Sequence, residues 1–139
     1  MVVDQNDLKF AWNWLRLGSL LERERFEGCS TQDAAAILDA AVQISEHEFA
    51  PHLRAADLNE PTIDADGNVS VLPDVAHAVQ VAADAGLFSS VFDSNLGGLQ
   101  LPHLVHTAVL GALMAGNLST ASFLLLTIGN ARLLCTYGN

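Results

Sequence analysis

Basic residues are scarce in this chain. Its 139 residues include six lysines and arginines against sixteen aspartates and glutamates, which gives a formal net charge of −10. Binding to the phosphates of nucleic acid requires clustered Lys and Arg side chains that release counterions. The sequence therefore predicts no nucleic acid partner, because the six cations are dispersed: Lys9, Arg16, Arg23, Arg25, Arg54 and Arg132.

Cysteine is nearly absent as well. Cys29 and Cys135 are the only two, which is too few for the disulfide framework of a secreted protein. The first residues, Met1 to Asp7, contain two acids and lack the basic segment and apolar run of a signal peptide. We therefore expect reduced cysteines and a cytoplasmic location.

The segment from residue 94 to residue 131 contains no charged side chain. Of the 22 charged residues, 21 lie between Asp4 and Asp93, and only Arg132 follows. A membrane-spanning helix needs about 20 consecutive apolar residues, so a span is the alternative to weigh here. Glycine, proline and polar residues cut the stretch into pieces of about a dozen residues or fewer, too short for that rule. We therefore predict that this segment does not span a membrane. We expect it to form buried helices, some of them covered by protein outside this chain. The residues that divide the stretch are Gly97, Gly98, Pro102, Gly116, Asn117 and Ser119.

Alanine and leucine are abundant, and half of all residues are hydrophobic. This composition favours one globular, mainly helical domain. Ser30 is a predicted N-cap, with Asp33 completing a capping box. Pro102 is expected to open a later helix, and Ser119 or Thr120 to cap the next one. The apolar spacing predicts helices over residues 8–27, 31–51, 73–86, 102–116, 119–128 and 131–137, the last two separated at Gly129-Asn130.

One segment departs from the helical pattern. Between residues 58 and 72, turn residues and acidic or amide side chains alternate around Gly67. We predict a short β-hairpin with a tight turn at Asp66-Gly67. An EF-hand calcium loop does not fit Asp64, Asp66 and Asn68, because the glycine falls between the second and third candidate ligands and no glutamate follows. The expected fold class is all-α in the main, with one short β-hairpin.

Residues with reactive or metal-binding chemistry are few. His103 and His106 share a predicted helix face, but no carboxylate or cysteine completes a metal site. His47 and His52 lie beside two glutamates and are interpreted as a solvated helix end. Neither cysteine and no serine lies in a motif that activates a nucleophile. The double glycine at 97–98 lacks the preceding strand and the third glycine of a dinucleotide-binding turn. The residues alone indicate no catalytic or metal site.

Several segments nevertheless follow one another in a recognisable order. An alanine-rich helix ends in alanine-proline, a second ends in alanine-glycine-leucine, and a double glycine leads to leucine-proline. A segment of leucine, threonine and glycine and a final glycine step come after them. Together they resemble the N-terminal helical domain of the acyl-CoA dehydrogenases over residues 31–139. The segments are Ala40–Pro51, Ala85-Gly86-Leu87, Gly97–Pro102, Leu126–Gly129 and Tyr137–Asn139.

The resemblance also divides the chain. Residues 1–30 resemble the additional N-terminal helix of longer members, and the middle β-domain and C-terminal helical domain of the family would follow Asn139. We therefore expect the chain to be too short to be such an enzyme alone. It departs from the family pattern at residues 93–95 and at Gln100, where the family has a proline with acids and a third glycine. These departures indicate a divergent member.

The resemblance implies a mechanism for a complete enzyme. In this family a glutamate removes the α-proton of an acyl-CoA while the β-hydride passes to the flavin of FAD. The base and most of the flavin site belong to the domains that would follow, so we expect no catalytic or FAD-binding residue in this chain. The family's N-terminal domain contributes a wall of the acyl pocket. The corresponding substrate-binding residues here are Ser122, Leu125, Leu126 and Gly129.

Other interpretations remain open. Residues 123–126 also fit an ordinary hydrophobic core, since leucine is commonly buried. As a whole, the chain is either part of a dehydrogenase, inactive by itself, or a stand-alone helical binding or dimerisation module without redox activity. A third alternative is one half of a two-chain dehydrogenase. In the first case the uncharged helices of residues 104–126 should leave an apolar face uncovered, and the chain should form homo-oligomers.

Overall fold

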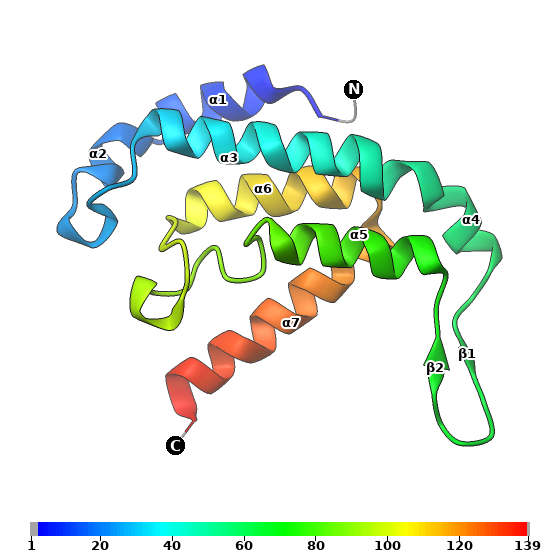
Figure 1. The fold of residues 1–139 in the computed structure, drawn as a ribbon. Helices are drawn as coiled ribbons and strands as arrows, with labels where there is room; N and C mark the ends of the chain where they lie inside the picture. The colour runs from blue at the N-terminus through cyan, green and yellow to red at the C-terminus, as the bar shows by residue number, and fades with distance from the viewer. Residues whose placement is uncertain (1–2, 139) are drawn as a thin grey trace.

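The chain folds into a body of packed helices from which a two-stranded hairpin projects (Figure 1). The computed structural model describes residues 3–138. The predicted fold class, mainly α-helical with one short β-hairpin, is confirmed over these residues. The α-helices and strands are α1 (Gln5–Trp14), α2 (Leu17–Leu21), α3 (Thr31–Ile44), α4 (Leu53–Leu58), β1 (Thr62–Ile63), β2 (Val69–Ser70), α5 (Pro73–Asp84), α6 (His103–Gly116) and α7 (Leu118–Tyr137).

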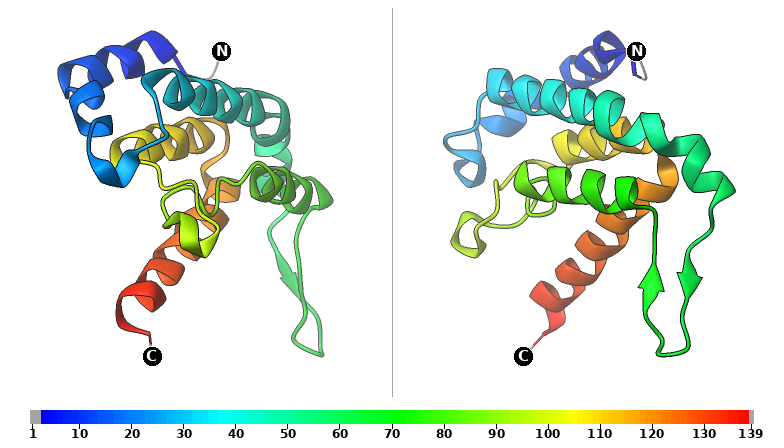
Figure 2. Two further views of the ribbon diagram at one scale, coloured as in Figure 1. Left: turned by 60° about the vertical axis from the view of Figure 1, so that its left-hand side comes forward. Right: turned by 45° about the vertical axis from the view of Figure 1, so that its right-hand side comes forward.

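Helix α6 is the centre of the body. Figures 1 and 2 show α3 lying along α6, with α5 beside them and α7 crossing below at an angle. Val109 and Leu113 of α6 pack in one cluster with residues of α5 and α7. Val105 and Ala112 pack in a second cluster with residues of α1, α2 and α3. Because α6 contributes to both clusters, it holds the N-terminal helices and the C-terminal helix in one core.

The predicted capping box opens α3. The hydroxyl of Ser30 accepts the backbone N–H of Asp33 at 3.1 Å, and the carboxylate of Asp33 accepts the backbone N–H of Ser30 at 2.8 Å. A hydrogen bond from the Ser30 hydroxyl, followed by the one from the Ser30 N–H, lowers the pKa of the Asp33 carboxyl. Two unpaired amide groups at the helix start are thereby satisfied.

The end predicted for this helix near Pro51 is wrong. After α3 the chain makes a π-helical turn at Ser45–Phe49 and a 3-10 turn at Ala50–His52, and then continues as α4 to Leu58. Proline has no N–H to donate and would clash with the carbonyl four residues earlier in a regular helix. The two irregular turns place Pro51 where that hydrogen bond is not required, so the chain bends and remains helical.

The single helix predicted over residues 8–27 is also wrong. Arg16 adopts a left-handed conformation with φ of 57°, which separates α1 from α2, and a 3-10 turn follows at Glu24–Phe26. The break allows Trp12 and Leu17 to enter the same core cluster against α3 and α6. Burial of these two side chains therefore offsets the cost of a left-handed arginine.

The hairpin forms where the sequence predicts it. Thr62 pairs with Ser70 and Ile63 with Val69 in antiparallel register. The carboxylate of Asp64 accepts the backbone N–H groups of Asp66 at 2.9 Å and Asn68 at 2.8 Å. The side-chain amide of Asn68, which donates to the Asp64 carboxylate at 3.0 Å, and then the backbone bonds lower the pKa of the Asp64 carboxyl. Together these bonds close the turn and account for the alternation of polar residues. Within residues 3–138, no group of three or more His, Cys, Asp or Glu side chains is arranged to hold a metal ion.

Helix α7 differs from the prediction at its N-cap and at Gly129-Asn130, where the sequence predicts a break. Gly129-Asn130 does not break it, and one helix runs for 20 residues from Leu118 to Tyr137. A glycine inside a helix costs only about 1 kcal/mol relative to alanine, which the packing of the preceding turns exceeds. The N-cap is Asn117, not Ser119 or Thr120, and its side chain accepts the backbone N–H of Thr120 at 3.2 Å.

The unbroken α7 bears on the membrane alternative. Ser119 lies inside this helix, so the division into pieces of about a dozen residues or fewer is wrong here. The helix is long and apolar enough to cross a membrane by length and composition. This is weak evidence for a span, because an apolar helix that packs against other protein passes the same test. The absence of a span therefore stays a prediction.

The loop between α5 and α6 needs both of its adjacent glycines. Gly97 has a φ of 76°, and a Cβ at Gly98 would collide with the carbonyl of Phe92 and lie 2.7 Å from that of Ser89. Gln100 adopts the glycine-like φ of 53° although it has a side chain. Its amide accepts the N–H of Ser94 at 3.1 Å and donates to the carbonyl of Arg25. Two side-chain hydrogen bonds thus hold Gln100 in the left-handed conformation. The double-glycine motif of the acyl-CoA dehydrogenases has its third glycine at this position.

Candidate functional site

The two faces of α7 have different surroundings. Thr120, Ala121, Leu124 and Ile128 are buried against the body of the protein. On the opposite side lies a surface that we call the open face, and it consists of Ser122, Leu125, Leu126, Gly129 and Leu133. These residues follow the i, i+3, i+4, i+7, i+11 spacing that places side chains along one side of a helix.

The structure brings all four residues predicted to bind substrate together on this open face. Leu125 and Leu126 are 44% and 65% exposed, and Gly129 has open space where a side chain would be. Ser122 is half-buried, and its hydroxyl donates to the carbonyl of Ser119 at 2.6 Å. The core interpretation is correct for Leu124 and wrong for Leu125 and Leu126.

The apolar character of α7 continues beyond the open face. Exposed large hydrophobic side chains occur along the helix at Leu118, Phe123, Leu134 and Tyr137 as well. The prediction that the uncharged helices leave an apolar face uncovered is confirmed for α7. It is wrong for α6, where Val105, Val109 and Leu113 are buried and the other large hydrophobic side chains are half-buried.

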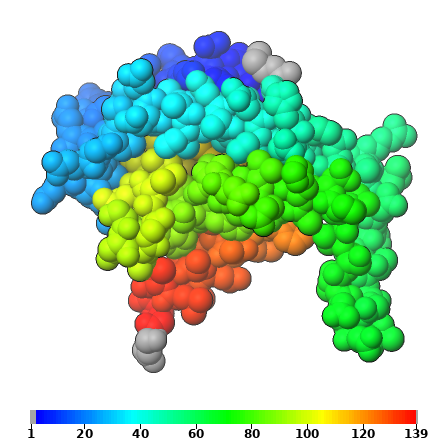
Figure 3. Space-filling model, viewed as in Figure 1, coloured from blue at the N-terminus to red at the C-terminus, as the bar shows by residue number. Residues whose placement is uncertain are grey.

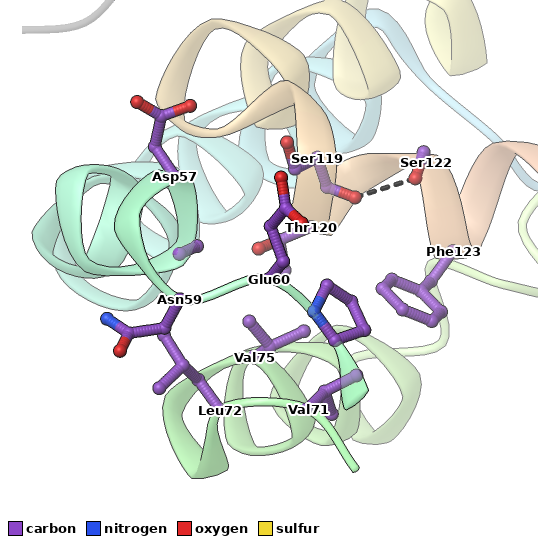
Figure 4. A pocket seen from close by; sticks show the side chains of 12 residues that line it. Asp57, Asn59, Glu60, Val71, Leu72, Val75, Ser119, Thr120, Ser122 and Phe123 are labelled. Carbon is purple, nitrogen blue, oxygen red and sulfur yellow. Dashed lines mark hydrogen bonds between the residues drawn. The ribbon is translucent and has the colours of Figure 1, made fainter. Parts of the chain in front are cut away.

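The hairpin and α7 project from the same side of the body (Figure 3). Between their bases lies a pocket of about 450 Å³, formed by the end of α4, the two ends of the hairpin, the start of α5 and the first turns of α7. Figure 4 shows Val71, Val75 and Phe123 among its lining, close to Ser122. The carboxylates of Asp57 and Glu60 supply the charge at its rim. The pocket thus joins the N-terminal end of the open face to a hollow lined by both apolar and polar side chains.

Sequence reasoning missed the hairpin side of this pocket. Val71, Leu72 and Val75 are distant from α7 in sequence, and only the packing of α5 against α7 brings them near. The core interpretation is wrong for Phe123 as well, because this side chain is 44% exposed and lines the pocket. The Asn59-Glu60-Pro61 turn is the local signal that the chain reverses here.

Buried polar side chains anchor the first turn of α7. His52 Nε2 and the hydroxyl of Thr120 lie 2.8 Å apart, and Asn117 donates its amide to the carbonyl of Phe49 at 3.3 Å. The interpretation of His52 as part of a solvated helix end is wrong because this side chain is buried, whereas His47 is exposed. The anchor ties α7 to the irregular turns that follow α3 and fixes the direction in which α7 leaves the body.

In the other histidine pair, His103 and His106, the side chain of His106 is buried and hydrogen-bonded. Nδ1 of His106 lies 3.0 Å from the hydroxyl of Ser90, which donates to the carbonyl of Leu87 at 3.0 Å. Burial, followed by the nearby His103 and Arg132, lowers the pKa of His106. His106 is buried and bonds to a fully buried serine, so it holds the α5–α6 loop on α6.

The fold and the open face define a mainly α-helical domain with one exposed apolar helix surface and an adjoining pocket. No protein-family model matches the chain, and no curated protein matches it.

Proposed function

We propose that this chain is the N-terminal helical domain of an acyl-CoA dehydrogenase-like flavoenzyme of the cytoplasm. In this proposal the open face of α7 forms one wall of the pocket that holds the acyl chain. The observation that carries the proposal is the position of Ser122, Leu125, Leu126 and Gly129, which share one exposed face. The order of motifs along residues 31–139 is the second support.

The chemistry of the open face suits a hydrocarbon chain. Each methylene that leaves water contributes about 0.8 kcal/mol, and none of the side chains on the open face is charged. The hydroxyl of Ser122 already donates within α7, so it needs no acceptor from a ligand. Space above Gly129 allows a chain to approach the helix backbone closely.

The catalytic steps would take place outside this chain. In the complete enzyme, FAD would accept a hydride and a glutamate would remove a proton, as the resemblance implies. We assign neither a base nor an FAD ligand to residues of this domain. A two-chain enzyme, in which a separate subunit supplies these groups, is a variant of the same proposal.

The alternative function is a stand-alone dimerisation or binding module without redox activity. The same exposed leucines favour it, because large apolar patches on a protein surface commonly mark association sites. The two functions differ in the ligand: a dimerisation module binds another copy and gains nothing from an acyl chain.

Substituting Leu126 tests the acyl wall. We expect the purified chain to bind octanoyl-CoA in a calorimetric titration and the Leu126→Asp variant to bind at least tenfold more weakly, because a carboxylate on the open face must be desolvated by the acyl chain. Leu15→Asp is the matched control, since Leu15 is also exposed but lies outside α7. Equal binding by both variants would assign the acyl chain to another surface.

A further inference from the structure

A second pocket lies near the C-terminal half of α7. Its volume is about 170 Å³, and it is formed by the 3-10 turn at Glu24–Phe26, the loop before α6, the start of α6 and the last turns of α7. Three cationic or protonatable side chains line it, namely Arg25, His103 and Arg132, together with the carboxylate of Asp93. We call this cavity the basic pocket.

Positive charge is concentrated here in an otherwise acidic chain. Two of its six lysines and arginines meet in the basic pocket. Arg25 forms an ion pair with Asp93, which neutralises one cation. No carboxylate within residues 3–138 forms an ion pair with the guanidinium of Arg132, so one positive charge is left uncompensated.

His103 lies beside the same positive charges. Burial lowers the pKa of His103, and the nearby Arg132 and Arg25 lower it further. Arg25, His103 and Arg132 all line this one pocket, so the two guanidinium groups disfavour the protonated imidazole. An anion between them would remove this repulsion.

The backbone at the start of α6 adds hydrogen-bond donors. Pro102 is the N-cap and offers no side-chain acceptor. The N–H groups of Val105 and His106 bond to the carbonyl of Pro102, whereas that of His103, which lines the basic pocket, has no acceptor within the described chain. A helix of 14 residues also presents a partial positive charge at this end.

We propose that the basic pocket binds the phosphate group of a small molecule. A guanidinium matches phosphate oxygens with two parallel hydrogen bonds, and Arg132 supplies one that is unpaired. The volume equals that of roughly six water molecules, which admits a phosphate group but not a whole nucleotide. Nucleic acid remains excluded, because one small pocket lacks the extended basic surface that such a partner needs.

This proposal does not rest on acyl binding by the open face. Arg132 follows Gly129 by three residues and lies at the edge of that face. A phosphorylated ligand could therefore reach both, but the basic pocket is complete without the open face.

Phosphate titration tests the proposal directly. Isothermal calorimetry with inorganic phosphate and with pyrophosphate, at fixed ionic strength, should detect saturable binding that Arg132→Gln weakens at least tenfold. Arg54→Gln is the matched control, because Arg54 is exposed and lies outside the basic pocket. Helical circular dichroism of each variant should equal that of the parent protein.

Coenzyme A in a parallel titration identifies the source of the phosphate. Displacement of inorganic phosphate by coenzyme A supports a nucleotide phosphate as the occupant, and binding of inorganic phosphate alone supports a free anion. The proposal is overturned if no phosphate compound binds, or if Arg132→Gln and Arg54→Gln weaken binding equally, since the interaction would then be general attraction to cations.

Discussion

Gly116→Ala is expected to lower the free energy of unfolding by about 3 kcal/mol, the upper range for forcing an extra methyl group into a packed site. At Gly116, α6 approaches the π-helical turn so closely that a Cβ would collide with the hydroxyl of Ser45 and lie 2.8 Å from its carbonyl. Phe49 blocks the remaining direction at 3.3 Å. The Ser45 hydroxyl donates to the carbonyl of Ala112 at 2.6 Å, so turning it away would leave buried polar groups unpaired.

Gly111→Ala in the same helix is the matched control for this prediction. Nothing lies within 4 Å of the added Cβ at Gly111, and alanine is favoured over glycine in a helix interior by about 1 kcal/mol. Urea denaturation should therefore show a lower midpoint for Gly116→Ala and a higher one for Gly111→Ala, with unchanged slopes. If both variants shift in the same direction, the close approach of α6 to the π-helical turn is not what requires glycine at 116.

The second large effect concerns association. We expect the isolated chain to form homo-oligomers through the exposed side of α7, and the double variant Leu126→Asp/Leu133→Asp to weaken this association more than a hundredfold. Two carboxylates would have to enter an apolar contact without partners, at a cost of several kcal/mol. Leu126 and Leu133 are 65% and 58% exposed, so the substitutions should leave the free energy of unfolding nearly unchanged.

Sedimentation velocity over a range of protein concentrations measures this association. The control is Phe10→Asp/Leu15→Asp, which changes two exposed hydrophobic side chains near the N-terminus. A parent chain that remains monomeric at high concentration would contradict the prediction. So would a loss of association in the control variant that equals the loss in the α7 variant.

The features predicted correctly from the sequence are those set by chemistry local in the chain. The Ser30 cap and the Asp66-Gly67 turn both depend on side chains within a few residues. The shared face of Ser122 and Gly129 likewise follows from helical periodicity once both lie in one helix. Such features need no knowledge of the rest of the fold.

The wrong predictions involve competition between local preference and packing. Arg16 takes a left-handed conformation because Trp12 and Leu17 are buried on either side of it. Gly129 stays helical because its cost is small beside the contacts of Leu124 and Ile128. The local sequence indicates the conformational cost at Arg16 and at Gly129. It does not indicate the packing contacts that offset this cost, because they come from distant segments.

The candidate site also combines features that the sequence predicts with features that depend on tertiary packing. Periodicity predicts which residues of α7 share a face, but whether that face is covered depends on where α3, α5 and α6 end. The hairpin side of the larger pocket and the basic pocket combine segments up to about a hundred residues apart, such as Arg25 and Arg132. Neither pocket has a signature in consecutive residues.

The most direct test of the central claim is the dependence of binding on acyl chain length. Calorimetric titration of the purified chain with butanoyl-, hexanoyl- and octanoyl-CoA should show affinity rising by up to fourfold per methylene, as expected for about 0.8 kcal/mol of hydrophobic burial each. Coenzyme A without an acyl group sets the baseline and removes any contribution from the basic pocket. An affinity that rises with chain length, and loses this rise in Leu126→Asp, supports α7 as an acyl-chain wall. An affinity equal for all four compounds would contradict it.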